Sequence, residues 1–270
     1  MSHTRSVASS LVALDVDGTL MSYAGVISPG VREAVHALRD AGAHVVLATG
    51  RSAVSVVPVA RDLGLGSGWV VASNGAVTLR LDPSLDDGYE VVRVVRFDPE
   101  PVLRVLRLEM PDALYAVEDV GTGFRVSAPF PAEELGGDHR VVSFEELCSE
   151  PVTRVIMRDP HGTPQEFHAL VERVGLHEVS YAVGWSAWLD LSPGGVSKGT
   201  ALEDLRRELG VEPFATVAIG DGNNDLEMLR WAARGVAMGH AADAVRAAAD
   251  EVTGTIDDDG ALEVLRSLLV

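Results

Sequence analysis

Four short stretches of the chain are apolar throughout and end in small polar or acidic residues. They read LVALDVDG at residues 11–18, AHVVLATG at 43–50, GWVVASNG at 68–75 and FATVAIGD at 214–221. Continuous apolar character, as opposed to alternation, is typical of strands that are buried on both faces of a parallel sheet. The pattern therefore predicts four parallel strands whose polar tails lie at one edge of the sheet.

Segments with apolar residues at helical spacing follow these runs. Ser28 fits the cap of a helix that ends at Gly42, and Ser197 fits the cap of another that ends at Gly210. A third helix is expected after Asn224. The apolar faces are Val31, Ala34, Val35 and Leu38; Ala201, Leu202, Leu205 and Leu209; and Leu226, Leu229 and Ala233. Alternating strands and helices predict a doubly wound, Rossmann-like α/β sheet, with any active site outside the carboxyl ends of the strands.

The pattern changes between residues 82 and 190. Segments such as EVVRVVRF (90–97) and FRVSAPF (124–130) alternate, which is typical of an antiparallel sheet covered on one side. A helix is expected near Pro164 to Val174. Units of the parallel type resume afterwards. We therefore predict a core formed by residues 1–81 and 191–270 and an inserted α+β domain at residues 82–190.

Composition and charge narrow the classes of function. The 270 residues are 47% hydrophobic and 23% charged, the balance of a globular protein with a sizeable core. The formal net charge of −18 repels nucleic acids and anionic membrane surfaces, so neither is an expected partner. No apolar run reaches the ~20 residues of a membrane span. With no secretory signal and only Cys148 as cysteine, the expected compartment is the cytoplasm.

Two acidic clusters fall at the predicted strand ends. Asp15 and Asp17 end the first apolar run, and Asp221 and Asp225 lie in the GDGNND segment. Carboxylates this close repel each other unless a cation lies beside them. Neither cluster has the glycine and glutamate spacing of an EF-hand. Hard oxygen ligands without nearby His or Cys favour Mg²⁺, although Asn224 or Asp225 could also cap the helix that follows.

The chain contains a single lysine, Lys198, among 22 cationic residues. Ser197 as a helix cap places Lys198 in the first helical turn, where a cation is unfavourable unless an anion binds there too. The segment GGVSKGT is not a Walker A motif, because Ser197 and not glycine precedes the lysine. The two remaining strand ends carry Thr49-Gly50-Arg51 and Ser73-Asn74-Gly75, which offer neutral donors and room for an oxyanion.

In this order, LDVDGTL, ATGR, the single lysine and GDGNND resemble the four motifs of the haloacid dehalogenase-like (HAD) hydrolase superfamily. The SNGA segment and the tail from GDGNND onward are similar to its Cof-type subfamily, the subclass IIB phosphatases. The resemblance covers residues 11–81 and 191–270. It fades across the middle of the chain, where the subfamily carries a variable cap domain that determines the substrate.

The resemblance implies a Mg²⁺-dependent phosphatase that acts on small phosphorylated metabolites, such as sugar phosphates or pyridoxal phosphate, through an aspartyl-phosphate. It implies that Asp15 is the nucleophile and that Asp17 is the general acid and base. Thr49 and Lys198 would hold the phosphoryl oxygens. The implied metal-binding set is Asp15, Asp17 (through its carbonyl), Asp221 and Asp225. The implied phosphate- or substrate-binding residues are Gly50, Arg51, Asn74, Gly75 and Asn224.

The motifs also bear on two other functions. A sugar phosphomutase of the same superfamily has a longer gap between the GD and ND elements than GDGNND allows. A non-catalytic sugar-phosphate-binding protein would be expected to lack at least one of Asp15, Asp17, Lys198 and Asp221, and all four are present.

The chain also departs from the subfamily pattern. His240 stands where the subfamily usually has asparagine, in a loop expected near the site. Among the cations of the middle segment, Arg125, Arg154 and Arg158 are expected on its solvated surface, although each could face the site and bind an anionic group.

Overall fold

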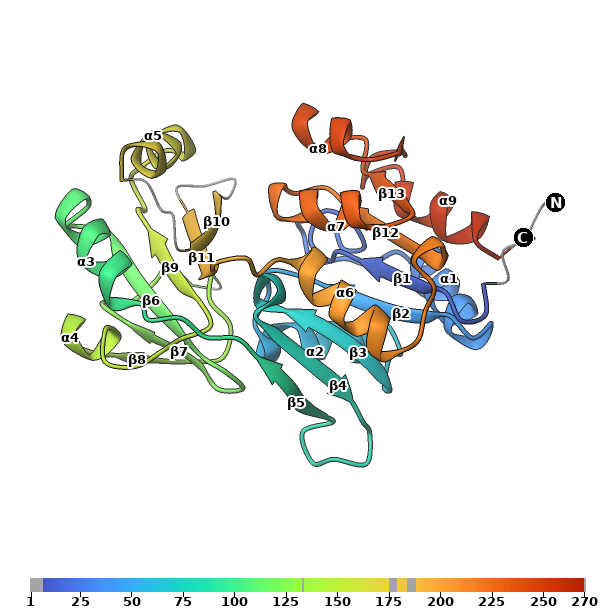
Figure 1. The fold of residues 1–270 in the computed structure, drawn as a ribbon, viewed down its shortest axis with the longest axis horizontal. Helices are drawn as coiled ribbons and strands as arrows, with labels where there is room; N and C mark the ends of the chain where they lie inside the picture. The colour runs from blue at the N-terminus through green and yellow to red at the C-terminus, as the bar shows by residue number, and fades with distance from the viewer. Residues whose placement is uncertain (1–6, 133, 175–178, 184–187, 270) are drawn as a thin grey trace.

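The computed structural model describes residues 7–132, 134–174, 179–183 and 188–269. Residues 1–6 lie outside the described residues. They belong to the segment in which no secretory signal is predicted. Figure 1 shows two lobes, each built on one sheet. The described residues contain no helix with both the length and the apolar character that crossing a membrane requires.

The larger sheet has the strand order β14-β13-β12-β1-β2-β3-β4-β5. The first six strands in that order are parallel, and β4 and β5 extend the sheet in antiparallel fashion. The strands are β1 (Leu11–Leu14), β2 (His44–Ala48), β3 (Gly68–Ala72), β4 (Val77–Leu81), β5 (Tyr89–Val94), β12 (Thr216–Gly220), β13 (Arg234–Ala237) and β14 (Glu251–Val252). The four apolar runs thus form adjacent parallel strands, and the doubly wound fold is confirmed.

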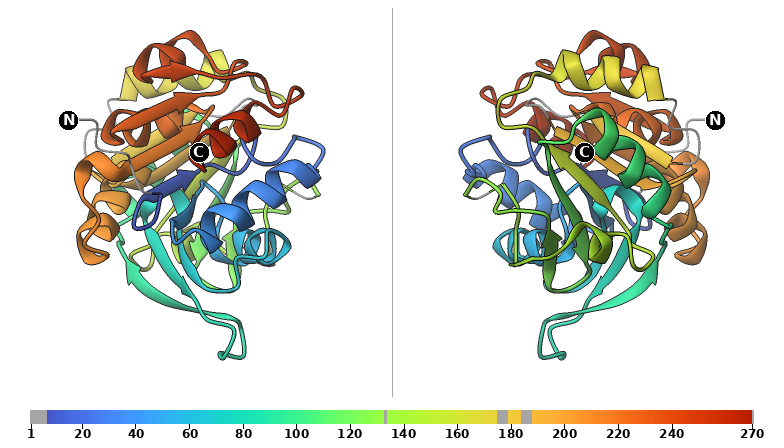
Figure 2. Two further views of the ribbon diagram at one scale, coloured as in Figure 1. Left: turned by 90° about the vertical axis from the view of Figure 1, so that its right-hand side faces the viewer. Right: turned by 90° about the vertical axis from the view of Figure 1, so that its left-hand side faces the viewer.

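Helices cover both faces of this sheet, because alternate side chains of each strand point to opposite sides. Val12 and Leu14 of β1 belong to a cluster with α1, α2 and α9, whereas Leu11 and Ala13 pack with α6, α7 and α8. Figure 2 shows blue α1 and red α9 on one side and orange α6 on the other. The helices are α1 (Pro29–Asp40), α2 (Ala53–Asp62), α6 (Lys198–Glu208), α7 (Leu226–Trp231), α8 (Asp243–Ala248) and α9 (Gly260–Ser267).

The predicted helices agree with the structure except at one end. The apolar face predicted for α1 is buried, and Ser28 caps that helix. Ser197 likewise caps α6. The prediction that α7 extends to Ala233 is wrong. The helix ends at Trp231, Ala232 is extended, and the Ala233 N–H donates to Thr216 Oγ1 at 2.8 Å instead of to the helix.

The second sheet has the order β10-β11-β9-β6-β7-β8 and is antiparallel except for the pair β7 and β8. We call this sheet and its three helices the cap. Its strands are β6 (Leu114–Asp119), β7 (Gly123–Val126), β8 (Asp138–Val141), β9 (Val155–Arg158), β10 (Val179–Val183) and β11 (Trp188–Pro193). Its helices are α3 (Glu100–Glu109), α4 (Phe144–Leu147) and α5 (Pro164–Val174), whose buried residues form one cluster with the sheet.

Two expectations for the middle of the chain are corrected. The strand in EVVRVVRF is β5, which pairs with β4 in the larger sheet, so the boundary predicted at residue 82 differs from the boundary between the sheets. The cap sheet was expected to have one polar face. Its second face carries charged residues, among them Arg154 and Asp190, together with an apolar cluster that includes Phe124, Val126 and Leu135, and it is turned toward a cavity shared with the larger sheet.

The strand order places a crevice beside β1. The chain moves from β1 to β2 and β3 on one side, then returns through β12 and β13 on the other. In such sheets, ligands bind outside the carboxyl ends of the strands at this point of reversal. Asp15 follows β1 and Asp221 follows β12, so both acidic motifs flank the crevice.

Candidate active site

Three carboxylates gather at the carboxyl ends of β1 and β12. Asp15 directly follows β1, and its N–H still donates to Ile219 O at 3.0 Å, which fixes it beside β12. Asp221 follows β12, and Asp225 closes the short 3₁₀ turn Asn223–Asp225. One carboxylate oxygen from each aspartate lies within 4.8 Å of the others, and all three residues are buried. The sequence predicted this juxtaposition from strand ends alone.

The single lysine joins this group. Lys198 is the first residue of α6 and is fully buried. Its Nζ donates to Asp15 Oδ1 and to Asp225 Oδ1, each at 2.6 Å. These two carboxylates offset the unfavourable position of a cation at a helix N-terminus. The prediction that Lys198 lies in the first turn, after Ser197 as cap, is confirmed.

Burial and mutual repulsion shape the protonation of this cluster. Burial raises the pKa of Asp15, the charge of Asp225 raises it further, and Lys198 only partly opposes the rise. Burial and Asp225 likewise raise the pKa of Asp221. Burial alone would lower the pKa of Lys198, but Asp15 and Asp225 outweigh it and raise that pKa. Three carboxylates sharing one ammonium group form a site with excess negative charge, which favours a further cation.

Hydrogen bonds distinguish the three aspartates. Both oxygens of Asp225 are occupied: Oδ1 accepts from Lys198, and Oδ2 accepts from the backbone N–H groups of Asp221 and Gly222 at 2.9 and 2.8 Å. Asp225 therefore holds Lys198 and the turn in place. Asp15 keeps Oδ2 without a hydrogen-bond partner among the described residues.

Three side chains surround Asp221. Thr19 Oγ1 donates to Oδ1 at 3.2 Å, and Tyr23 OH donates to Oδ2 at 3.0 Å. His240 Nε2 lies 3.4 Å from the same Oδ2, while its Nδ1 accepts from Ile256 N–H at 3.2 Å. The expectation that His240 lies near the site is thus confirmed. The sequence did not identify Thr19 or Tyr23, although both follow the acidic pair within eight residues of Asp15.

Asp17 lies apart from the cluster of three carboxylates. Because β1 ends at Leu14, the chain turns before Asp17, and the two aspartates do not continue the strand. The Asp17 carboxylate forms a two-pronged ion pair with Arg51, with N–O distances of 2.6 and 2.7 Å. Thr49 is buried next to this pair, and its Oγ1 accepts from Arg51 N–H at 3.1 Å. The Asp17 carboxylate is thus held by Arg51 and lies outside the group formed by Asp15, Asp221 and Asp225.

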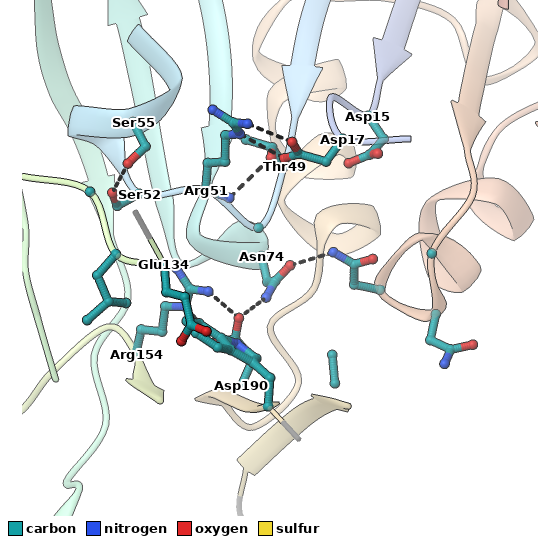
Figure 3. A pocket seen from close by; sticks show the side chains of 18 of the residues that line it. Asp15, Asp17, Thr49, Arg51, Ser52, Ser55, Asn74, Glu134, Arg154 and Asp190 are labelled. Carbon is teal, nitrogen blue, oxygen red and sulfur yellow. Dashed lines mark hydrogen bonds and ion pairs between the residues drawn. The ribbon is translucent and has the colours of Figure 1, made fainter. Parts of the chain in front are cut away.

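A cavity of about 970 Å³ connects these groups to the cap, and Gly50 lines it. Asn74 bridges the two sides, and it adopts a left-handed backbone conformation with φ of 54°. Its Oδ1 accepts from Asn224 Nδ2 at 3.0 Å, and its Nδ2 donates to Asp190 Oδ2 at 3.2 Å. Figure 3 shows Asn74 between the pair Asp17–Arg51 and the cap residue Asp190.

Gly75, predicted to bind phosphate, is not among the residues that line this cavity. It has a φ of +102°, and a Cβ built on it would lie 2.2 Å from Ser197 O. This glycine therefore allows the turn after β3 to pack against the start of α6. Its place in the site is indirect, because it lets α6 present Lys198 to the carboxylates.

The expectation that three cap arginines are solvated is wrong. The side chains of Arg125, Arg154 and Arg158 are only 4%, 9% and 12% exposed. Each is buried against carboxylates, since a buried guanidinium needs a paired charge. The partners are Asp119 and Glu150 for Arg125, Asp190 for Arg154, and Glu134 for Arg158. Only Arg154 of the three lines the cavity.

A comparison with known proteins identifies the family. The family model for haloacid dehalogenase-like hydrolases matches residues 12–108 and 127–265. The chain belongs to the haloacid dehalogenase-like hydrolase family. This agrees with the resemblance seen in the four motifs, and the matched residues include every member of the carboxylate cluster and Lys198.

Relatives extend the match over almost the whole chain. Pyridoxal phosphate phosphatase YbhA of Escherichia coli K12 is 31% identical over 96% of this chain and 98% of its own. The structure of BT1666, a HAD phosphatase from Bacteroides thetaiotaomicron, superposes with a TM-score of 0.80 at 27% identity, over 100% of this chain and 99% of its own. The HAD subclass IIB sugar phosphatase BT4131 gives a TM-score of 0.81 at 25% identity, over 97% and 100%. The protein is therefore a HAD-like phosphatase.

Proposed function

We propose that this HAD-like phosphatase hydrolyses phosphate monoesters of small metabolites through a covalent phosphoryl group on Asp15. The observation that carries the proposal is the buried Asp15 carboxylate, which lines the cavity and is held by a buried lysine beside two further carboxylates. Hydrolysis of phosphate monoesters is among the slowest uncatalysed reactions, so the site must supply a nucleophile and neutralise charge.

Asp15 supplies the nucleophile. Lys198 holds Oδ1, which leaves Oδ2 to attack the phosphorus atom. As the bond from Oδ2 to phosphorus forms, the bond from phosphorus to the ester oxygen breaks and the alcohol leaves. Water then attacks the phosphorus, the bond to Asp15 breaks, and inorganic phosphate is released. Covalent catalysis by a carboxylate thus divides one difficult step into two easier ones.

Asp17 transfers the protons of both steps. Once it has taken up a proton from solvent, it gives that proton to the departing ester oxygen, and it later accepts one from the attacking water. In the structure its carboxylate is occupied by Arg51, so proton transfer requires Arg51 to turn to another anion. The phosphoryl group of the substrate is that anion. Arg51 then binds a phosphoryl oxygen together with Thr49 and Lys198. This breaks its ion pair with Asp17, whose carboxylate can then transfer protons.

Mg²⁺ fits the cluster by charge and by ligand type. The carboxylates of Asp15 and Asp221 are hard oxygen donors. Together with Asp225 they place three carboxylates around the single ammonium group of Lys198, which favours a further cation. These two residues and the Asp17 carbonyl would hold the ion, and Asp225 would support them through Lys198. When bound, the ion would supply neutralisation of the phosphoryl oxygens and of the Asp15 carboxylate.

The test is the release of inorganic phosphate from p-nitrophenyl phosphate and from a panel of phosphorylated metabolites. We expect turnover with Mg²⁺ and its loss with EDTA, restored by excess Mg²⁺. Asp221→Asn should need a higher Mg²⁺ concentration for half-maximal activity. Absence of metal-dependent turnover with every ester of the panel would refute the proposal.

A further inference from the structure

The described residues on the cap side of the cavity include one cation, Arg154, whose charge is paired with that of Asp190. Among the described residues that line the cavity, the only cationic side chains are Arg51, which pairs with Asp17, and Arg154. Arg154 Nε donates to Asp190 Oδ1 at 2.7 Å, and its Nη2 contacts Asp190 Oδ2 closely. Both side chains are 9% exposed. The charge of Arg154 is therefore cancelled where a substrate would lie.

The geometry of the pair holds it in that state. Asn74 Nδ2 donates to the same Asp190 Oδ2, so the carboxylate accepts from two neighbouring residues. Arg154 comes directly before β9, and Asp190 lies in the adjacent β11, so two neighbouring strands fix the distance. Separating the two would leave a buried, unpaired charge on each side, which is strongly unfavourable.

A further acidic group on the cap side, Glu134, adds to the effect. Glu134 lines the cavity, and its pairing with Arg158 leaves no surplus positive charge there. An anionic group on the distal part of a substrate would meet Asp190 and Glu134 without an unpaired cation to bind it. Juxtaposed like charges are a recognised means of rejecting the wrong partner.

The same residues suit a substrate whose distal part is neutral and carries hydroxyl groups. Arg154 Nη1 has no hydrogen-bond partner among the described residues, and Asp190 Oδ1 accepts only one bond, so the pair can both donate to and accept from hydroxyl groups. Phe124, Leu135 and Trp188 offer apolar contact for carbon atoms on the same wall. The wall therefore combines polar and apolar contacts without net positive charge.

We propose that Asp190, by neutralising Arg154, makes the cavity select monophosphates of neutral hydroxylated compounds against those with a second anionic group. This inference rests on the proposed phosphatase function and names its specificity-determining residue. It also disfavours the phosphomutase alternative, because a bisphosphate would place a second phosphoryl group against this paired wall.

The experiment compares substrates that differ only by one distal carboxylate. Glucitol 6-phosphate, an open-chain polyol, is paired with 6-phosphogluconate, and glycerol 3-phosphate with 3-phosphoglycerate; in each pair a carboxylate replaces one hydroxymethyl group. For the wild-type enzyme we expect kcat/KM for the neutral member to exceed that for the anionic member on the order of 10²-fold, the scale of opposed charges in a desolvated site. Equal values for both pairs would overturn the inference.

The Asp190→Asn variant tests the residue itself. Asparagine keeps the shape and leaves the charge of Arg154 unpaired, so the ratio should fall about tenfold or more, with kcat/KM for the anionic member rising in absolute terms. A purely structural role would lower both members together. Glu109→Gln is the matched control, because it removes one carboxylate from a surface pair with Arg173 outside the cavity and should leave the ratio unchanged. An unchanged ratio in Asp190→Asn would refute the assignment.

A second variant keeps the test decisive if Asp190→Asn folds poorly. Arg154→Gln leaves Asp190 without its cation, so it should increase the preference for the neutral member, and a lowered preference would contradict the inference. Release of phosphate from p-nitrophenyl phosphate serves as the reference. If that ester is hydrolysed with Mg²⁺ but the substrate pairs are not distinguished, the phosphatase function stands and the inference about Asp190 fails.

Discussion

The two ends of the cavity differ in the balance of their positive and negative side chains. At the carboxyl edge of the larger sheet, Asp15, Asp221 and Asp225 share one ammonium group, Lys198. At the cap, Arg154 forms an ion pair with Asp190 and also interacts electrostatically with the buried Glu118, so no positive charge is left over. An unbalanced buried cluster favours charged ligands, which in the proposed function are a metal ion and a phosphoryl group. A balanced pair favours a neutral ligand, so chemistry and selectivity are separated along one cavity.

The largest expected effect comes from the nucleophile. Asp15→Asn removes the attacking oxygen but preserves shape, so turnover should fall on the order of 10⁴-fold or more, as for other nucleophiles. The measurement is phosphate release at saturating substrate and Mg²⁺. Thermal unfolding is the control, because the variant should stay folded: it removes one of three repelling carboxylates. Turnover within tenfold of wild type would rule out Asp15 as nucleophile.

The next effect concerns the only lysine. Lys198→Arg keeps the charge, but a planar guanidinium is larger than the compact ammonium that fits between Asp15 and Asp225. Turnover should fall on the order of 10²-fold or more, the scale of losing one donor to a developing oxyanion. Arg207→Lys, a change of the same kind on an exposed side chain, is the matched control. Near-normal turnover of Lys198→Arg would show that the site does not require an ammonium group.

The carboxylate cluster should also make the free energy of unfolding depend on pH and on the Mg²⁺ concentration. The pKa values of Asp15 and Asp221 are raised in the folded state, so the folded chain binds protons more tightly there than the unfolded chain. The free energy of unfolding in EDTA should therefore lose a contribution as pH rises from about 4, the unfolded value, through the raised pKa values. Mg²⁺ should restore it, by about 2.7 kcal/mol at 100 times its Kd.

Thermal unfolding at a series of pH values, with Mg²⁺ and with EDTA, checks this expectation. Asp221→Asn removes one of the two groups, so its gain from Mg²⁺ should be smaller than that of the wild type. Identical melting temperatures with Mg²⁺ and with EDTA at every pH would exclude a metal site in the carboxylate cluster.

The smallest effect is expected at His240. Its Nε2 lies 3.4 Å from Asp221 Oδ2, a long contact, and Thr19 and Tyr23 already donate to this carboxylate. Residues that orient metal ligands contribute about 10–100-fold in affinity when their contacts are strong. His240→Asn should therefore weaken Mg²⁺ binding, measured by calorimetry, by less than about tenfold. A larger loss would make His240 a main support of Asp221.

The contrast between the two ends also separates what the sequence could predict from what it could not. Asp15, Lys198 and Asp221 could be placed together because each lies at a strand end or helix start, and a parallel sheet brings these points to one edge. No local sequence pattern predicts the contact between Arg154 and Asp190, because that contact depends on which cap strands become neighbours. One signal was present: Asp190 lies between two leucines in a strand, where a charge needs a buried partner.

The fold shows the same division. The four apolar runs predicted adjacent parallel strands, since burial on both faces leaves a continuous pattern. Alternation predicted a strand near Tyr89–Val94, but the pattern could not say which sheet it joins, because an edge strand of either sheet packs little, and no residue of β5 is buried. The hydrogen bonds to β4 decide this, and they follow from the hairpin that connects the two strands.

The most direct test of the account is to locate the phosphoryl group on the protein during turnover. The enzyme is mixed with ³²P-labelled substrate and Mg²⁺, quenched in acid within the first turnovers, digested and mapped by peptide. We predict label on the peptide that contains Asp15 in the wild-type enzyme and none in Asp15→Asn. Label retained in Asp15→Asn, or label on a different peptide in the wild type, would contradict the central claim that Asp15 carries the phosphoryl group.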